Sequence, residues 1–241
     1  MVYQEFLIGT ALILLGHALL VGYAGLRLAG NALLSVFGIW LFASALWFGF
    51  GHVAPPGSLT FTVIFVPLFV CFEDFIRTWF VGSRVRRHAS VAASSLAFAV
   101  VASLVEIVVQ TSNLIAATTR KALELPVTGD VEFFDAFFSS YAVPLAAVGL
   151  NAIRPGIHYL LCVSLFYAWR VRRWSIYAAL IATHAAVDVA IELVAETHPV
   201  NYPISAFGIA VIFALLLFAA TLWIRAITKQ RCTDRAWPSK S

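Results

Sequence analysis

The sequence contains few charged residues. Asp, Glu, Lys and Arg make up only 12% of its 241 residues, whereas 61% are hydrophobic, and the mean hydropathy is +0.91. A soluble domain carries about 25% charged residues, because its surface must face water. The composition therefore excludes an ordinary soluble globular protein and indicates a single membrane domain over residues 1–241.

Cysteine is also scarce. The three cysteines are Cys71, Cys162 and Cys232, and none belongs to a C-x-x-C pair. Two lie in hydrophobic segments, so we interpret them as small hydrophobic side chains and not as part of a disulfide framework. The H-E-x-x-H motif of many zinc enzymes is absent as well, and we expect neither a metal ion nor a cofactor.

Long apolar runs dominate what is present, and a run of about 20 residues is enough to cross a bilayer. Seven segments qualify, at residues 6–26, 32–51, 59–82, 90–116, 140–169, 174–195 and 203–226. The first has no basic leader and no cleavage site, so it is predicted to be a retained helix. The sequence thus predicts an all-α, polytopic membrane bundle of about seven transmembrane helices, followed by a tail at residues 227–241.

Basic residues mark alternate connections between these segments. They are Arg27, Arg84, Arg86, Arg87, Arg170, Arg172, Arg173, Arg225, Lys229 and Arg231. Cytoplasmic loops are enriched in Lys and Arg, so the N-terminus is predicted outside and the C-terminus in the cytoplasm, in the inner or plasma membrane of the cell. The net charge of +4 comes largely from these short basic loops, which report the orientation in the membrane. No nucleic-acid partner is therefore expected.

One outer connection has a mixed composition. Residues 130–140 read DVEFFDAFFSS and combine acids with phenylalanines. Such a stretch is consistent with an interfacial amphipathic helix on the outer face. A solvated loop with aromatic anchors explains it equally well, so both interpretations stay open.

Charged residues interrupt the third apolar segment. Residues 68–80 read LFVCFEDFIRTWF and contain Glu73, Asp74 and Arg77. A charged side chain in the membrane interior costs about 3 kcal/mol or more, and such residues usually mark functional sites. Glu73 and Arg77 are four residues apart and share a helix face, as do His184 and Asp188. The alternative explanation for both pairs is structural: each pair holds or orients a helix and has no functional role.

Counting from the basic anchors at about 1.5 Å per helical residue gives the depth of each polar side chain. Glu73 and His184 lie about 16 Å deep, and His158 about 18 Å. Asp188 is near 22 Å and His17 near 15 Å. In a hydrocarbon core about 30 Å thick, these depths cluster around the midplane.

Glu106 and Arg154 differ from this group. The same count places them about 28 Å and 24 Å from the basic side, toward the outer interface. An ion pair between them and an Arg154 that extends to outer water are both consistent with the sequence. Residues 154–156, Arg-Pro-Gly, are expected to break or kink the fifth segment, because proline removes a helix hydrogen bond.

The clustered groups suit the hydrolysis of an amide. A carboxylate in a low-dielectric pocket binds a proton more tightly than in water, so it can act as a general base near neutral pH. Histidines on neighbouring helices can donate hydrogen bonds to an oxyanion. Glu73 with His158 and His184 is therefore a plausible water-activating set. The same groups could ligate zinc, but the sequence lacks the H-E-x-x-H motif that would support a zinc site.

Several short motifs resemble those of a known protease group. Glu73-Asp74-x-x-Arg77 resembles the paired-acid motif of the PrsW-type and CPBP-type intramembrane proteases, which include the type II CAAX prenyl endopeptidases. Residues 96–106 (LAFAVVASLVE), the RPGIHYL stretch with His158, and HAAVD with His184 and Asp188 resemble the later motifs in the same order. The resemblance covers about residues 60–195.

The resemblance implies a role for each matching residue. Glu73 would activate water, Asp74 would be the second acid, and Arg77 a positioning group. His184 and Asp188 would be the oxyanion and orienting pair, and His158 resembles a histidine of the PrsW-like branch. The sequence departs from the group in two places: the second acid is Asp, and Ala102 stands where the CPBP branch has the histidine of F-x-x-x-H.

Three functions of different classes are consistent with these residues. The first is a glutamic-type intramembrane endopeptidase that cleaves membrane-embedded or lipidated proteins, with a cavity opening to Glu73 from the half of the membrane that holds the basic loops. The second is a non-catalytic scaffold for partner transmembrane helices, because the anterior pharynx-defective subunit of gamma-secretase is similar and belongs to the same superfamily. Midplane acids and histidines also serve proton-coupled transporters, a third interpretation.

Overall fold

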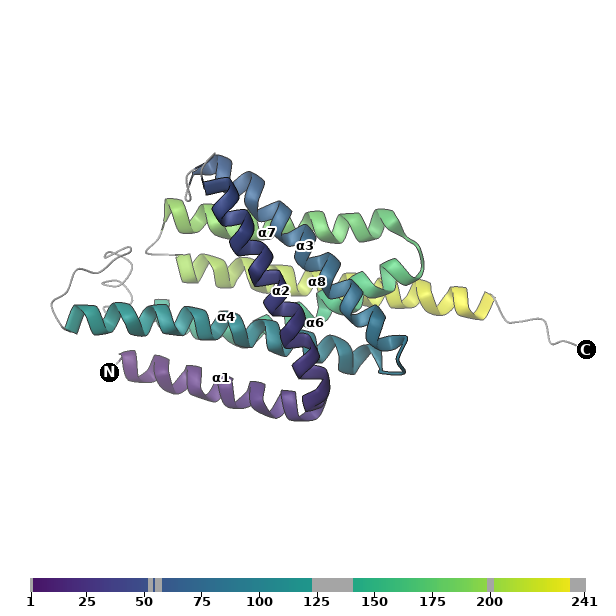
Figure 1. Ribbon diagram of the computed structural model, residues 1–241, viewed down its shortest axis with the longest axis horizontal. Helices are drawn as coiled ribbons and strands as arrows, with labels where there is room; N and C mark the ends of the chain where they lie inside the picture. The colour runs from purple at the N-terminus through teal and green to yellow at the C-terminus, as the bar shows by residue number, and fades with distance from the viewer. Residues whose placement is uncertain (1, 52–53, 55–57, 123–140, 199–201, 235–241) are drawn as a thin grey trace, which may run out of the picture.

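The structure is a computed structural model that describes residues 2–51, 54, 58–122, 141–198 and 202–234. All regular secondary structure in these ranges is helical, so the all-α prediction is confirmed. The helices are α1 (Val2–Ala24), α2 (Leu26–Gly51), α3 (Leu59–Val85), α4 (Val91–Ala122), α6 (Ala142–Arg170), α7 (Trp174–Thr197) and α8 (Tyr202–Asp234) (Figure 1). Within the described residues, seven helices are long and apolar enough to cross a membrane, as expected for a multi-pass membrane protein.

The turn between α1 and α2 is tighter than predicted. The second apolar segment was expected to begin at residue 32, but α2 begins at Leu26, directly after Gly25. Gly25 has a φ of 96°, a left-handed conformation that glycine adopts without steric cost. The chain therefore reverses at one residue, and Arg27 lies in the first turn of α2.

Proline does not break α6. Of the break or kink expected at residues 154–156, the break is wrong, since α6 continues from Ala142 to Arg170 with Pro155 inside it. Proline removes one amide donor, and membrane helices tolerate this where neighbouring groups satisfy the freed carbonyl. Because α6 continues, Arg154 and His158 lie four residues apart on one helical face.

Two helices extend beyond their predicted ends. α4 continues to Ala122 and α8 to Asp234, so the predicted tail at 227–241 begins as helix. The interfacial stretch considered at 130–140 lies outside the described residues, as do the last residues of the tail, 235–241.

α3 and α6 form the centre of the bundle. α3 packs against α2, α4, α6 and α7, and α6 packs against α1, α4, α7 and α8. One apolar cluster joins α2, α3, α4 and α6 around Phe80, Phe98 and Phe166. A second joins α6, α7 and α8 around Leu161 and Phe213. α3 therefore holds its polar residues against several neighbouring helices.

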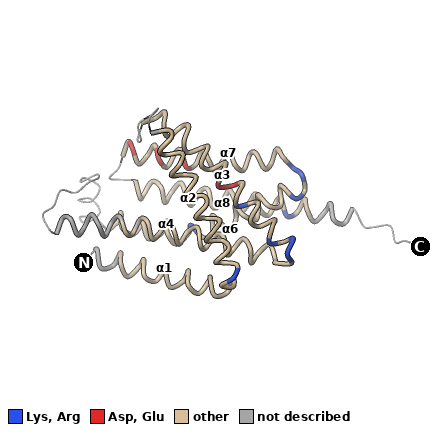
Figure 2. The backbone as a smooth tube through the Cα atoms, in the orientation of Figure 1, with Lys and Arg blue, Asp and Glu red and all other residues tan. Residues whose placement is uncertain are grey.

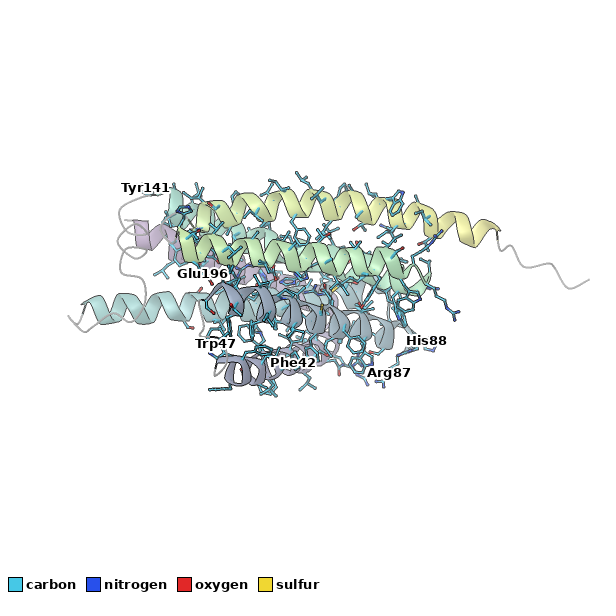
Figure 3. All side chains as sticks on the ribbon, turned by 90° about the horizontal axis from the view of Figure 1, so that it is seen from above. Phe42, Trp47, Arg87, His88, Tyr141 and Glu196 are labelled. Atoms are coloured by element: carbon cyan, nitrogen blue, oxygen red, sulfur yellow. The ribbon has the colours of Figure 1, made fainter. Side chains whose placement is uncertain are left out.

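The two ends of the bundle differ in charge. Lys and Arg gather in the turns α1–α2, α3–α4 and α6–α7, which we call the basic end (Figure 2). Arg87 and His88 lie at this end, whereas Tyr141 and Glu196 lie at the opposite one (Figure 3). The alternation of basic connections that the sequence predicted thus corresponds to one physical end of the structure.

A buried hydrogen bond joins α6 to α8. Ser164 Oγ and Thr221 Oγ1 are 2.6 Å apart, and both side chains are buried. Thr221 Oγ1 donates its proton to Leu217 O within α8, at 2.7 Å. The proton between the two helices must therefore come from Ser164.

Ser164→Ala is expected to lower the free energy of unfolding in detergent by about 0.6 kcal/mol, the average for hydrogen bonds between membrane helices. Ser103→Ala is the matched control, because buried Ser103 donates only to Ala99 O within α4. Unfolding by denaturant, followed by circular dichroism, measures both variants. Equal losses from the two variants would contradict a stabilising role of the Ser164 bond.

Candidate functional site

The centre of the site is a charged cluster on α3. Arg77 Nη2 donates to Glu73 Oε1, and Arg77 Nη1 donates to Asp74 Oδ1. Spacings of three and four residues place both acids on the same helix face as the arginine. The shared face predicted for Glu73 and Arg77 is confirmed, and Asp74 belongs to it as well.

This cluster is removed from solvent. Asp74 and Arg77 are 0% exposed and Glu73 is 7% exposed. Burial of isolated charges costs several kcal/mol each, so mutual pairing is required to keep them there. The Arg77 guanidinium also lies 5.6 Å from the centre of the Phe98 ring of α4, a cation–π geometry.

His158 joins the cluster from α6. Its Nδ1 lies 3.0 Å from Arg77 Nη2 and 4.0 Å from Glu73 Oε1. A guanidinium only donates hydrogen bonds, so Nδ1 must accept, and a neutral ring then carries its proton on Nε2. His158 Nε2 lies 3.2 Å from Glu106 Oε1, which is placed to accept that proton in a hydrogen bond.

His184 joins the cluster from α7. Its Nδ1 lies 3.0 Å from Asp74 Oδ2, so the ring donates to this carboxylate. Its Nε2 is 3.6 Å from Asp188 Oδ2, close for an ion pair but too long for a hydrogen bond. The ring stacks on Phe213 of α8, with 5.8 Å between centroids and 13° between planes. The structure therefore brings together all six residues proposed from the sequence.

Glu106 belongs to the same cluster, which the sequence did not predict. Its Oε1 contacts His158, and its Oε2 lies 3.4 Å from Arg154 Nη1. Of the two options left open for Arg154, the ion pair is the one observed, and the Arg154 side chain is only 14% exposed. One signal was available: Arg154 and His158 share a face of α6, so a carboxylate between them contacts both.

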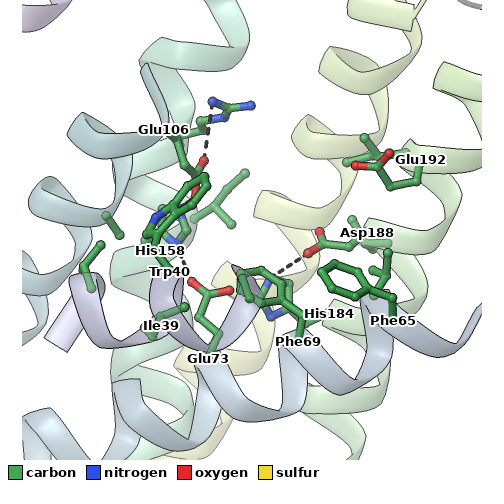
Figure 4. Close-up of a pocket in the computed structure, with 18 of the residues that line it drawn as sticks. Ile39, Trp40, Phe65, Phe69, Glu73, Glu106, His158, His184, Asp188 and Glu192 are labelled. Carbon is green, nitrogen blue, oxygen red and sulfur yellow. Dashed lines mark ion pairs between the residues drawn. The ribbon is translucent and has the colours of Figure 1, made fainter. Parts of the chain in front are cut away.

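A cavity of about 660 Å³ lies beside the cluster. The charged and histidine side chains that line it are Glu73, Glu106, Arg154, His158, His184, Asp188 and Glu192 (Figure 4). Asp74 and Arg77 lie behind this wall and do not line it. Among the residues of the charged cluster on α3, Glu73 is thus the one that faces open space.

The cavity lies on the side away from the basic end. Its wall includes Trp47 of α2, Glu192 of α7 and Tyr202 of α8, each near the end of its helix opposite the basic turns. The expectation that the cavity opens from the half with the basic loops is therefore wrong. The physical reason is packing: around Glu73, the space between the helices is open toward this half.

His17 lies apart from the site despite its similar predicted depth. Its Nδ1 donates to Ile13 O at 2.8 Å within α1. The side chain lines a second cavity, of about 940 Å³, together with Gly156 and Tyr159 of α6. Equal depth therefore does not bring two residues together when their helices face different neighbours.

Metal binding and disulfide bonding are two further chemistries that His, Cys, Asp and Glu side chains can support. In the helices that the structure describes, no three His, Cys, Asp or Glu side chains are grouped in a way that could hold a metal ion. Cys71 and Cys162 carry free thiols, and the side chain of Cys232 lies outside the described residues. The charged and histidine side chains of the site are carboxylates, imidazoles and guanidinium groups.

Arg77→Met is expected to destabilise the protein by about 3–5 kcal/mol, because it leaves two buried carboxylates without their cation. The triple variant Glu73→Gln, Asp74→Asn, Arg77→Met removes the charges together and is expected to recover most of that loss. Thermal unfolding in detergent measures both. A single variant as stable as the wild type would contradict the pairing described above.

The chain matches no family model, no curated protein and no solved structure.

Proposed function

We propose that this protein is a glutamic-type intramembrane endopeptidase that hydrolyses peptide bonds of membrane-embedded or lipidated proteins. One observation carries the proposal. Of the two paired acids on α3, Glu73 is the one whose side chain lines a cavity in the membrane-spanning part of the bundle, while Asp74 is wholly buried. The Glu73 carboxylate is buried by its pairing with Arg77 and still faces the cavity. It is therefore placed to take a proton from a water molecule there.

Glu73 is the general base in this mechanism. Its Oε1 accepts from Arg77, which leaves Oε2 for a water molecule in the cavity. Oε2 takes a proton from water, and the water oxygen attacks the carbonyl carbon of the substrate. The carbon–nitrogen bond then breaks, and the proton passes from Glu73 to the leaving amine. One water and one amide become a carboxylic acid and an amine.

His184 stabilises the oxyanion. It lines the cavity beside Glu73, and as an imidazolium it donates from Nδ1 to Asp74 and keeps its Nε2–H for the charge that develops on the carbonyl oxygen. His158 also lines the cavity, but its Nε2–H faces Glu106 and its Nδ1 accepts from Arg77, so it positions Arg77 beside Glu73. Asp74 holds both Arg77 and His184, and Asp188 lies at the other edge of the His184 ring. Asp74, Arg77 and Asp188 thus position the reacting groups.

The sequence resemblance supports the same function. The motifs over about residues 60–195 resemble the PrsW-type and CPBP-type intramembrane proteases, and we infer that this chain is a distant member of that superfamily. Their role-bearing positions correspond to Glu73, His158 and His184, which lie around one cavity. Ala102 also lines this cavity and supplies no polar group.

We further propose an outside N-terminus, a cytoplasmic C-terminus, and a location in the inner or plasma membrane of the cell. The clustering of Lys and Arg at one end of the bundle supports this orientation (Figure 2). The cavity then lies in the outer half of the membrane, opposite the basic end. A substrate would reach Glu73 from that half.

A scaffold for partner transmembrane helices is the second candidate. The observation that favours it is the complete burial of Asp74 and Arg77, whose contacts connect α3 to α6 and α7. Polar contacts of this kind hold membrane helices in register without any chemistry. The cavity beside Glu73 favours the protease.

Glu73→Gln is expected to abolish cleavage while the fold is kept, because the amide still accepts from Arg77 but cannot take a proton from water. Host cells would express wild type or variant at equal levels, and mass spectrometry would compare the N-termini of their membrane proteins. Glu192→Gln is the matched control, since Glu192 lines the same cavity away from Arg77. Termini that appear with wild type and with this control, but not with Glu73→Gln, would support the protease.

Intact cleavage by Glu73→Gln would exclude Glu73 as the base. Identical termini from all forms, with each stably inserted, would shift the assignment to the scaffold. In that case, recovery of partner proteins with the His158→Ala or His184→Ala variant is expected to fall below that with the wild type.

The proposed orientation predicts which cysteines react in intact cells. In a background without native cysteines, Glu196→Cys is expected to be labelled by a membrane-impermeant maleimide. Arg87→Cys, at the opposite end of the bundle, is expected to react only after the membrane is opened (Figure 3). The reverse pattern would overturn the orientation and, with it, the outer location of the cavity.

A further inference from the structure

We propose that Glu106 is a positioning residue that holds His158 in place for the reaction at Glu73. The role in the reaction rests on the proposed function, whereas the contact itself does not. Glu106 is the polar residue that α4 contributes to the cavity wall, because the other α4 residue lining it, Ala102, has no polar side-chain atom.

The His158 ring is held at both edges. Arg77 of α3 lies 3.0 Å from Nδ1, and Glu106 of α4 lies 3.2 Å from Nε2. The ring itself belongs to α6 and is buried. Three helices therefore meet at one imidazole, and each edge has a partner of fixed character: a donor at Nδ1 and an acceptor at Nε2.

Only one neutral tautomer satisfies both partners. With the proton on Nε2, the ring accepts from Arg77 and donates to Glu106. With the proton on Nδ1, two N–H groups would face each other at Arg77, and a lone pair would face the Glu106 carboxylate. A buried polar group without its partner costs about 1–3 kcal/mol, so the contact with Glu106 favours the first arrangement.

Arg154 offers a competing explanation for Glu106. The two side chains are 3.4 Å apart, and the Glu106 side chain is 32% exposed to the cavity. If Glu106 served only to balance the charge of Arg154, His158 would not depend on it. A test must therefore separate the contact with His158 from the contact with Arg154.

The first measurement is nuclear magnetic resonance of the full-length protein labelled with ¹⁵N-histidine in detergent micelles. The sequence has six histidines, and His158→Asn assigns the signal of interest. The wild type is expected to show a strongly downfield Nε2–H proton for His158. Glu106→Leu, which removes the acceptor, is expected to lose it; Glu106→Gln, which keeps an amide oxygen, and Arg154→Gln are expected to retain it.

The second measurement is cleavage of a substrate found with the wild type. Glu106→Leu is expected to lower the rate about 10- to 100-fold, the effect of losing one hydrogen bond to a charged group. Glu106→Gln is expected to recover most of the rate. The double variant Glu106→Leu, Arg154→Gln is expected to stay as slow as the single one, because charge balance alone does not restore the acceptor.

The outcomes separate the two proposals. A His158 proton on Nδ1, a signal unchanged in Glu106→Leu, or full recovery in the double variant would overturn the positioning role of Glu106. A wild type that cleaves nothing, but whose His158 signal depends on Glu106 as described, would support the contact and overturn the protease. Thermal unfolding of each variant in detergent separates a slow enzyme from an unfolded one.

Discussion

The arginine on α3 is the residue on which the rest of the site depends. Arg77 pairs with Glu73 and Asp74 within one helical turn and donates to His158 of α6. In the interior of a membrane, two adjacent carboxylates without a cation would be too costly to keep. A guanidinium suits this position because its planar fork presents several N–H donors at once, whereas a lysine ammonium is a single point of charge.

Polar contacts spread from this centre to the neighbouring helices. His158 connects the cluster to α6 and, through Glu106, to α4, while His184 connects it to α7. Membrane helices associate mainly through van der Waals packing, so directional contacts of this kind determine register and rotation. They also explain why Glu73 and Asp74, although adjacent in sequence, have different surroundings: Asp74 has both oxygens engaged and is buried, while Glu73 faces the cavity.

Local patterns predicted much of this arrangement. Hydropathy predicted seven spans, and spacing of three to four residues predicted the face shared by Glu73 and Arg77. Depth counted from the basic anchors also brought His158 and His184 to the level of Glu73. The same count failed for His17, which lies in a different cavity, because depth does not reveal which helices are neighbours.

The helices, their alternating basic turns and the charged cluster on α3 thus follow from local patterns, since each depends on residues close together in the chain. Three features became visible only in the packed bundle: Glu106 contacts His158, Glu73 and not Asp74 lines the cavity, and the cavity lies away from the basic end. These features depend on how far each helix is rotated about its axis and on the space left between helices. Both are set by the packing of all the spans together, which no local pattern encodes.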